Sequence, residues 1–356
     1  MIELKIKNLV FSIFFMLVTS DENNCRITEF PHVSTIVEKC TDIIISNLTV
    51  PAGETLRLDL QKGSKLTFEG ITVFEVAYWQ GYLLHITGDQ VLVQGAPGSI
   101  LNAQGEKYWD GQGGDGGVTK PRFLHVVATG GSIFKNLYLL NCPRFCVGVG
   151  GSDFTITGWT IDVVAGNTRG GLNTDGFGIG GHNILIENSV VMNQDDCVVV
   201  HSGSGLFFKN LQCYGSHGLS FSVGSSTNDN TKNSVISNIT FSDCLVANGL
   251  YGIHIKTKKG VGTIEDVTYQ NIALIGIQED GIYINQDYGD IGNVSRQFEI
   301  TELNMINIYG SLQGQFTRPV HIVCNENKCS NWNWTNINLI GSGKSFCSFI
   351  PSGFSC

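Results

Sequence analysis

The chain has 356 residues, of which 44 are glycine and only 15% are charged, and its formal net charge is −9 at pH 7. This length accommodates one large core or two ordinary domains, but no Ser/Pro-rich run, charge block or low-complexity segment marks a linker. We therefore expect a single domain over residues 21–356. The acidic balance argues against nucleic acid as a partner, although a local basic patch can still attract a polyanion.

The first 20 residues have the pattern of a secretory signal peptide. Lys5 and Lys7 precede the apolar run Leu9–Val18, and Thr19-Ser20 follow it. The run is too short to span a bilayer comfortably, which disfavours the alternative of a membrane anchor. We expect a secreted, extracellular protein with no membrane attachment in its mature form.

Eleven cysteines fit an oxidising compartment, in which most of them should pair. Their spacing allows one disulfide to close a cap at the start of the chain and two to staple its other end; these pairs are Cys25/Cys40, Cys324/Cys329 and Cys347/Cys356. The pairing of Cys142, Cys146 and Cys244 stays open, with Cys244 a candidate for a buried free thiol because it lies inside an apolar run.

Secretion also fits four sequons for N-glycosylation, which begin at Asn47, Asn238, Asn293 and Asn333.

From Cys40 onward, short β-rich runs alternate with corners of Gly, Asn, Ser and Asp, and almost no stretch has helical periodicity. The early strands are predicted at Thr41–Val50, Thr55–Leu60, Ser64–Phe68, Leu83–Ile86, Val91–Gln94 and Phe123–Val127.

A short phrase then recurs, often at roughly 22 to 29 residues, a spacing typical of repeat architectures. Examples are Phe134-Lys135-Asn136-Leu137 and Phe208-Lys209-Asn210-Leu211. Units this small must stack to bury their apolar faces, and Asn tolerates the left-handed backbone of tight corners. The pattern predicts an all-β right-handed parallel β-helix with an N-terminal cap. A jelly-roll or β-sandwich is the alternative.

Two adjacent carboxylates, Asp195 and Asp196, lie between apolar runs with no basic residue nearby. An exposed acidic turn is the simplest interpretation of such a pair. If coils stack in register, however, Asp175, His217 and the segment His254–Lys256 fall on the same face, one or two coils apart. Clustered acids raise one another's pKa, so that one stays protonated while another is ionised.

Such a set of acids meets the requirement of glycoside hydrolysis, which needs one acid and one base. Adjacent strand residues point to opposite faces, so Asp195 and Asp196 reach one cleft only if the strand is interrupted. We therefore predict a bend or bulge at this pair.

Four motifs together resemble the polygalacturonases of glycoside hydrolase family 28. They are Asn173-Thr174-Asp175, Gln194-Asp195-Asp196-Cys197, His217-Gly218 and Ile255-Lys256-Thr257. Their order and spacing fit the family, and the resemblance runs over nearly the whole mature chain. It includes Tyr108-Trp109-Asp110-Gly111, Lys120-Pro121 and Gln286-Asp287-Tyr288.

This resemblance implies a parallel β-helix that hydrolyses α-1,4-galacturonan with inversion. Asp195 would be the general acid, Asp175 and Asp196 would activate water, and His217 would tune the acid. On the substrate side, Lys256 would pair with a galacturonate carboxylate, Tyr288 would contact the sugar, and Asn173 and Gln194 would complete the site. Cys197 and Cys213 would form a disulfide that braces the catalytic coil.

The sequence departs from the family at His254, because the family motif is Arg-Ile-Lys. Histidine lacks the planar, permanently charged fork of arginine and carries charge only near or below about pH 6.5. If His254 binds substrate, we expect weaker binding, an acid-shifted optimum, or both. A milder departure is Ser216, where the family usually has Gly.

Three functions remain open at this stage. The first is an endo-acting polygalacturonase, since no insertion looks able to block one end of a groove. The second is a catalytically weakened galacturonan-binding protein, suggested by His254. The third is a Ca²⁺-dependent pectate lyase, which ranks last because no separate acidic cluster is evident. No cofactor and no metal site are expected, and the partner is pectin or polygalacturonate bound by a monomer.

Overall fold

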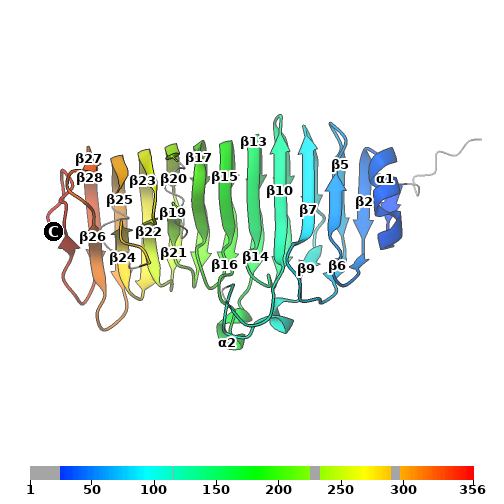
Figure 1. The fold of residues 1–356 in the computed structure, drawn as a ribbon, viewed down its shortest axis with the longest axis horizontal. Helices are drawn as coiled ribbons and strands as arrows, with labels where there is room; N and C mark the ends of the chain where they lie inside the picture. The colour runs from blue at the N-terminus through cyan, green and yellow to red at the C-terminus, as the bar shows by residue number, and fades with distance from the viewer. Residues whose placement is uncertain (1–24, 115, 225–232, 290–296) are drawn as a thin grey trace, which may run out of the picture.

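The computed structural model describes residues 25–114, 116–224, 233–289 and 297–356. Its strands stack into one long sheet that runs from the N-terminal end to the C-terminal end of the chain (Figure 1). Every pairing between the named strands is parallel and joins strands of successive coils. The architecture is the predicted right-handed parallel β-helix, since parallel crossovers are almost always right-handed. Jelly-rolls and β-sandwiches are built from antiparallel strands, which excludes that alternative.

The strands form three ladders. The first comprises β4 (Leu56–Asp59), β7 (Tyr82–Asp89), β10 (Arg122–Thr129), β13 (Val147–Thr157), β15 (Phe177–Glu187), β17 (Val198–Lys209), β19 (Leu219–Val223), β22 (Tyr251–Thr257), β24 (Asp280–Asn285), β26 (Arg318–Val323) and β29 (Phe346–Cys347).

The second ladder contains β1 (Arg26–Ile27), β2 (Asp42–Ser46), β5 (Lys65–Glu69), β8 (Leu92–Gly95), β11 (Ser132–Lys135), the later parts of β13, β15 and β17, β20 (Asn233–Ser242), β23 (Val261–Ile277), β25 (Phe298–Leu312) and β27 (Cys329–Ser330). The third contains β3 (Thr49–Val50), β6 (Ile71–Phe74), β9 (Ile100–Asn102), β12 (Tyr138–Leu140), β14 (Thr160–Asp162), β16 (Val190–Met192), β18 (Gln212–Tyr214), β21 (Leu245–Ala247), the ends of β23 and β25, and β28 (Asn333–Ile340).

The core is a column of inward apolar side chains, one above another at the same register. In the first ladder, one row of fully buried residues is Leu84, Leu124, Val147, Phe177, Val198, Leu219, Ile253 and Ile282. Because each coil buries its apolar face only against the next, the stacking holds the register of every strand fixed. That register decides which polar residues become neighbours.

Asparagine residues occupy the corners between strands, as the recurring sequence phrase predicts. Asn136, Asn210 and Asn238 have φ of 57°, 51° and 55°, in the left-handed region that Asn tolerates. One expected strand is wrong, because Thr41–Val50 forms two strands, β2 and β3. The break falls at Asn47, whose φ is 50°.

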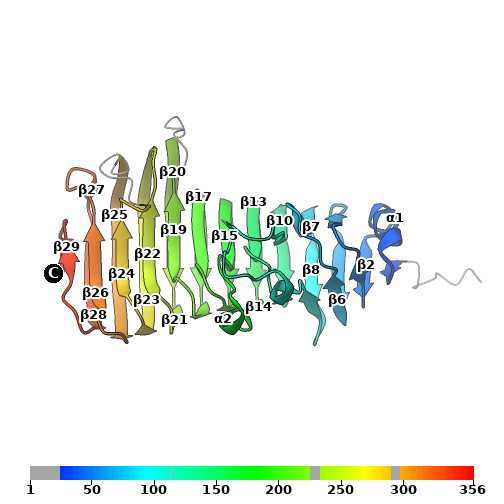
Figure 2. The same cartoon turned by 60° about the horizontal axis from the view of Figure 1, so that its bottom comes forward.

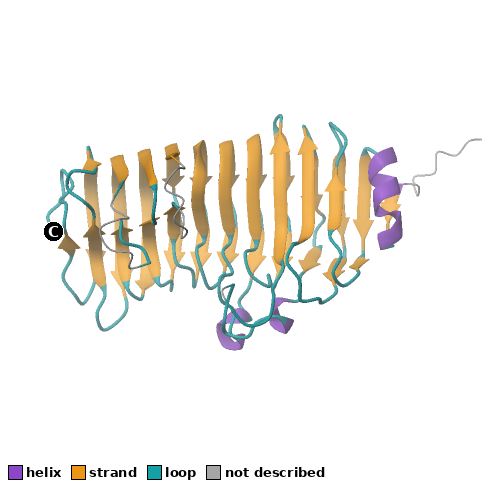
Figure 3. Cartoon of the chain, in the orientation of Figure 1, coloured by secondary structure: helices purple, strands orange, loops and turns teal. Residues whose placement is uncertain are grey.

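A cap covers the first coil. The short helix α1 (Val33–Lys39), preceded by the 3-10 turn η2 (Phe30–His32), buries Val33 and Val37 against the end of the core, and Figures 1 and 3 show it at the N-terminal end of the stack. The other helical segments, η3 (Gly105–Lys107) and α2 (Gly166–Arg169), lie together on loops at one side of the helix (Figure 2). Within the described residues, no helix is long and apolar enough to cross a membrane. The expected signal peptide, residues 1–20, lies outside the described residues.

Candidate active site

The candidate acids lie on corners that lead into the first ladder. Val147, Phe177, Val198 and Leu219 pair in one row. Two residues before each of the last three come Asp175, Asp196 and His217, so these groups stack on adjacent coils. The predicted bend is present, since residues 193–197 lie between β16 and β17 and belong to neither strand. Both acids of the pair line the same cleft.

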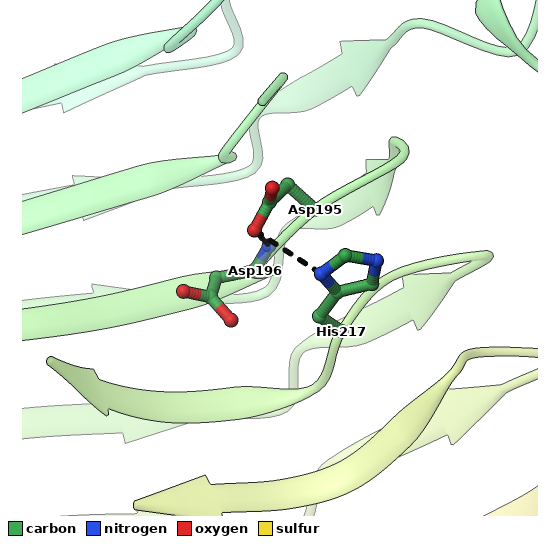
Figure 4. A group of neighbouring side chains, drawn as sticks. All are labelled: Asp195, Asp196 and His217. Carbon is green, nitrogen blue, oxygen red and sulfur yellow. Dashed lines mark hydrogen bonds and ion pairs between the residues drawn. The ribbon is translucent and has the colours of Figure 1, made fainter. Parts of the chain in front are cut away.

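Asp195 is the member of the pair more open to the cleft, with 15% of its side chain exposed. Its Oδ1 lies 3.3 Å from His217 Nδ1 and accepts a 2.7 Å hydrogen bond from the backbone N–H of Asp196. Asn173 donates to its Oδ2 over 3.1 Å. Figure 4 shows the imidazole of His217 turned toward the Asp195 carboxylate, with Asp196 beside them.

Asp196 is locked in place by two donors. Lys256 Nζ lies 2.6 Å from its Oδ2, with 6% and 3% of the two side chains exposed. On the other oxygen, Ser220 Oγ donates over 2.7 Å. Ser220 pairs with His254 of the next coil, two positions before the pair Ser222 and Lys256. The sequence interpretation assigned Ser220 no role, because a single Ser in a strand gives no signal.

Burial and neighbouring charges shift the pKa values of the three acids in different directions. Asp175 Oδ1 is buried without a hydrogen-bond partner, and burial together with the charges of Asp195 and Asp196 raises its pKa well above the usual range. Burial also raises the pKa of Asp196, against the opposing charge of Lys256. Burial alone would raise the pKa of Asp195, but the hydrogen bond and charge of His217 outweigh it and lower that pKa. Of the three carboxyls in the substrate-free protein, Asp175 is therefore the one whose surroundings most favour the protonated form.

The neighbouring carboxylates raise the pKa values of the two basic groups, Lys256 and His217. Burial opposes the charge of Lys256, but Asp196 and Asp195 outweigh it and raise its pKa to about 12. Burial likewise opposes the charge of His217, and its hydrogen bond to Asp195 reverses that effect, so the pKa of His217 is raised. Asp195, Asp196 and His217 also offer ligand atoms within 4.8 Å of one another. This trio is the set among the described residues that could hold a cation, but Lys256 already bonds to one of its carboxylates.

Two neighbouring amides build the corner itself. Asn193, which is buried, donates through Nδ2 to the carbonyls of Thr174, Asp195 and Asp196. The sequence interpretation assigned it no role. Gln194 was expected to bind substrate, but its amide is used inside the protein: Oε1 accepts from Thr174 Oγ1 and Nε2 donates to the carbonyl of Val163. Its side chain does not line the cleft, and its hydrogen bonds instead tie the corner to the preceding coil.

His254 is not brought into the cleft lining. It is 3% exposed, its ring stacks on Tyr283 with centroids 4.9 Å apart, and Tyr251 and Tyr288 lie at 4.4 and 5.8 Å. Neither ring nitrogen has a hydrogen-bond partner. Burial lowers the pKa of His254 well below the usual value of about 6.5, so its ring is charged only at a lower pH than that of a free histidine.

Lys256 and Tyr288 do line the cleft. Lys256 Nζ lies 5.4 Å from the centroid of the Tyr288 ring, and Lys258 Nζ lies 5.7 Å from it. The lining continues to the other side of the acids along the ladder, through His201, Gly178, Val147, Arg122 and Tyr82. His201, Arg122 and Tyr82 were not singled out by the sequence.

The two central histidines are expected to titrate far apart. As pH falls, His217 should take up its proton first, above the usual pH of about 6.5, because Asp195 stabilises the cation. His254 should remain neutral well below that pH, because the imidazolium would be buried among tyrosines. Imidazole ¹⁵N chemical shifts recorded from pH 8 to 4 on the intact protein measure both. A His254 titration near that of an exposed histidine would contradict the burial seen here.

The four expected disulfides are present, together with Cys142–Cys146, and the pairs are Cys25–Cys40, Cys142–Cys146, Cys197–Cys213, Cys324–Cys329 and Cys347–Cys356. Cys197 follows the acid pair directly, so its bridge to β18 braces the corner. Cys244 is free and buried. Of the sequon residues, Asn47, Asn238 and Asn333 are exposed, and Asn293 lies outside the described residues.

Known proteins are similar to this chain in both sequence and architecture. Residues 40–356 match Glycosyl hydrolases family 28. A polygalacturonase of Phaedon cochleariae is 44% identical over 350 residues, which cover 94% of each chain. An endopolygalacturonase of Emericella nidulans is 42% identical over 327 residues, covering 89% of this chain and 85% of the relative.

Among solved structures, endopolygalacturonase I of Stereum purpureum in complex with two galacturonates superposes with a TM-score of 0.80 at 29% identity, over 90% of this chain and 95% of that one. An endo-xylogalacturonan hydrolase of Aspergillus tubingensis shares the fold, with a TM-score of 0.79 at 19% identity over 93% and 98%. The chain belongs to glycosyl hydrolases family 28, a family of glycoside-cleaving enzymes.

Proposed function

We propose that this protein is a secreted endo-polygalacturonase that hydrolyses α-1,4-galacturonosyl linkages with inversion. The observation that carries the proposal is the stack of Asp175, Asp195 and Asp196 in one cleft, with His217 and Lys256 bonded to two of them. The relatives named polygalacturonase support the substrate class, and the disulfides support an oxidising compartment.

Asp195 donates its proton to the glycosidic oxygen as the bond to the anomeric carbon breaks. On the opposite face of the sugar, Asp196 and Asp175 hold a water, and one carboxylate takes its proton as the oxygen attacks. The pKa of Asp195 is lowered in the substrate-free site, so the acid has to take up a proton from solvent when substrate binds. Galacturonate carboxylates and the exclusion of water both raise a nearby carboxyl pKa, which favours a protonated Asp195 in the complex.

An endo mode fits the length of the cleft. Its lining comes from seven neighbouring strands, β7, β10, β13, β15, β17, β19 and β22. Asp195 and Asp196 precede the fifth of these, so ligand-facing residues lie on both sides of the acids. A polymer can be bound on either side of the bond that is cut.

Release of reducing ends from polygalacturonate between pH 4 and 7, with and without a chelator, tests the proposal. We expect release that the chelator does not affect and no unsaturated product. An ultraviolet-absorbing product would identify a lyase instead. Binding to polygalacturonate with no product at all would favour a non-catalytic galacturonan-binding protein.

A further inference from the structure

Arg122 lies in the same row as the proposed acids, on the N-terminal side of the cleft. It stands two residues before Leu124, which pairs with Val147, just as Asp175 and Asp196 stand two before Phe177 and Val198. One step along the row, between Arg122 and Asp175, comes Phe145. At about 4.8 Å per strand, Arg122 is about 10 Å from the coil of Asp175 and about 14 Å from that of Asp196.

The guanidinium of Arg122 is held between two aromatic rings. Its Cζ lies 5.5 Å from the centroid of Tyr82 on the preceding coil and 5.5 Å from that of Phe145 on the following one. One terminal nitrogen of Arg122 donates to Tyr82 Oη over 3.0 Å. The His125 ring stacks on the Tyr82 ring, with the two centroids 4.8 Å apart. These contacts hold the guanidinium in position while the side chain stays exposed.

Such an arrangement suits a carboxylate. One N–H group of Arg122 is used by Tyr82 Oη, and a guanidinium has five N–H donors, so others can donate to a carboxylate. Among the described residues, no carboxylate lies within ion-pair distance of Arg122. The second guanidinium on this side, that of Arg144, lies 5.3 Å from the Phe145 centroid and also lines the cleft.

The distribution of charge indicates that the N-terminal side of the cleft helps to attract a polyanionic substrate. The chain carries a net charge of −9, and at the acids the charge of Lys256 is already engaged by Asp196. A polyanion approaching three carboxylates therefore needs attraction from elsewhere. Lys258 supplies positive charge on the C-terminal side of the acids, and Arg122 supplies it on the N-terminal side.

We infer that Arg122, clamped by Tyr82 and Phe145, binds a carboxylate of the substrate chain about three coils from the bond that is cut. This inference rests on the proposed function and names a binding residue that the sequence motifs do not include. Long galacturonan chains reach Arg122 from the acids, whereas the shortest oligomers do not. The residue therefore makes the enzyme prefer long chains and fixes where it cuts them.

The test is the dependence of kcat/KM on chain length for wild type and for Arg122→Gln. On polygalacturonate we expect the substitution to lower kcat/KM about tenfold, mainly through KM, because one charged hydrogen-bonding partner is lost. The deficit should shrink stepwise as purified oligogalacturonides become shorter, and the cutting positions in end-labelled oligomers should shift. Arg122→Lys keeps the charge and should recover part of the loss.

Lys209→Gln is the matched control, because it removes an exposed positive charge of β17 outside the cleft lining. It should follow wild type at every length. A deficit of Arg122→Gln that is equal at all lengths, or absent at all lengths, would overturn the inference. Should Arg122→Gln fold poorly by its thermal midpoint, Tyr82→Phe removes the hydroxyl that holds the guanidinium and should give a smaller deficit with the same length dependence.

Affinity electrophoresis separates this inference from the proposed function. If wild type releases no reducing ends, the hydrolase proposal fails, yet retardation in a gel containing polygalacturonate still reports binding. Weaker retardation of Arg122→Gln than of Lys209→Gln would support the carboxylate site, and equal retardation would overturn it. In a gel containing fully methyl-esterified pectin, the two variants should run alike, because the ester carries no charge.

Discussion

Replacing Asp195 by Asn is expected to lower kcat on polygalacturonate by about 10³-fold or more while the protein stays folded. An amide cannot donate the proton that the leaving oxygen needs. Its Oδ1 can still accept from the Asp196 N–H and from His217, and the side chain is partly exposed, so the structural cost is small. Initial rates and the thermal midpoint of the purified variant measure the two effects.

The unliganded pKa directions make the identity of the proton donor a sharp question. In the free protein the pKa of Asp175 is raised and that of Asp195 is lowered, so the surroundings of Asp175 favour the protonated form and those of Asp195 the ionised one. An oligogalacturonide with a 2,4-dinitrophenyl leaving group distinguishes them, because that group departs without protonation. Asp195→Asn should recover most of its lost rate on this substrate, while Asp175→Asn and Asp196→Asn should not.

Two results would contradict this division of labour. Activity of Asp195→Asn on polygalacturonate within a few-fold of wild type would remove Asp195 from the role of acid. Recovery of Asp175→Asn on the activated substrate, with none for Asp195→Asn, would transfer that role to Asp175. In either case the three-carboxylate site would stand and the roles within it would change.

The register of the coils explains what the sequence could predict. Repeats of similar length place residues such as Asp175, Asp196 and His217 at the same position of successive coils, so their proximity follows from spacing alone. The interruption at Asp195 follows from the same register, whereas the disulfide Cys197–Cys213 was expected from the family resemblance alone. These features depend on the backbone path, which the apolar periodicity determines.

Side-chain packing explains what the sequence could not predict. Spacing puts His254 on the cleft face, but Tyr251, Tyr283 and Tyr288 cover its ring, and their combined effect appears only in three dimensions. Likewise, Gln194 Nε2 donates to the backbone carbonyl of Val163 on the preceding coil, a contact that sequence spacing does not show. Arg122 directly follows the motif Lys120-Pro121 but is not part of it, and its alignment with the acids becomes visible only once strand register is known.

Removal of the buried cation at the centre of the site should have the largest effect on stability. Lys256→Met is expected to lower the free energy of unfolding by about 3 kcal/mol or more at pH 7, because it leaves the buried Asp196 carboxylate without its partner. The urea midpoint of unfolding measures this loss. At Lys209, which is exposed, the same change should cost at most about 0.5 kcal/mol.

The pH dependence of this loss identifies its cause. Burial already raises the pKa of Asp196, and without Lys256 it should rise further. A carboxyl whose pKa is higher in the folded than in the unfolded protein destabilises the fold when ionised, and it ceases to do so as pH falls through the folded pKa toward the unfolded value of about 3.9. The deficit of Lys256→Met should therefore shrink between pH 7 and 4.5.

Adding Asp196→Asn to Lys256→Met should restore part of the stability at pH 7, because the uncompensated charge is then gone. A deficit that is the same at both pH values and in the double variant would mean that lost packing of the lysine stem, not the ion pair, destabilises the protein.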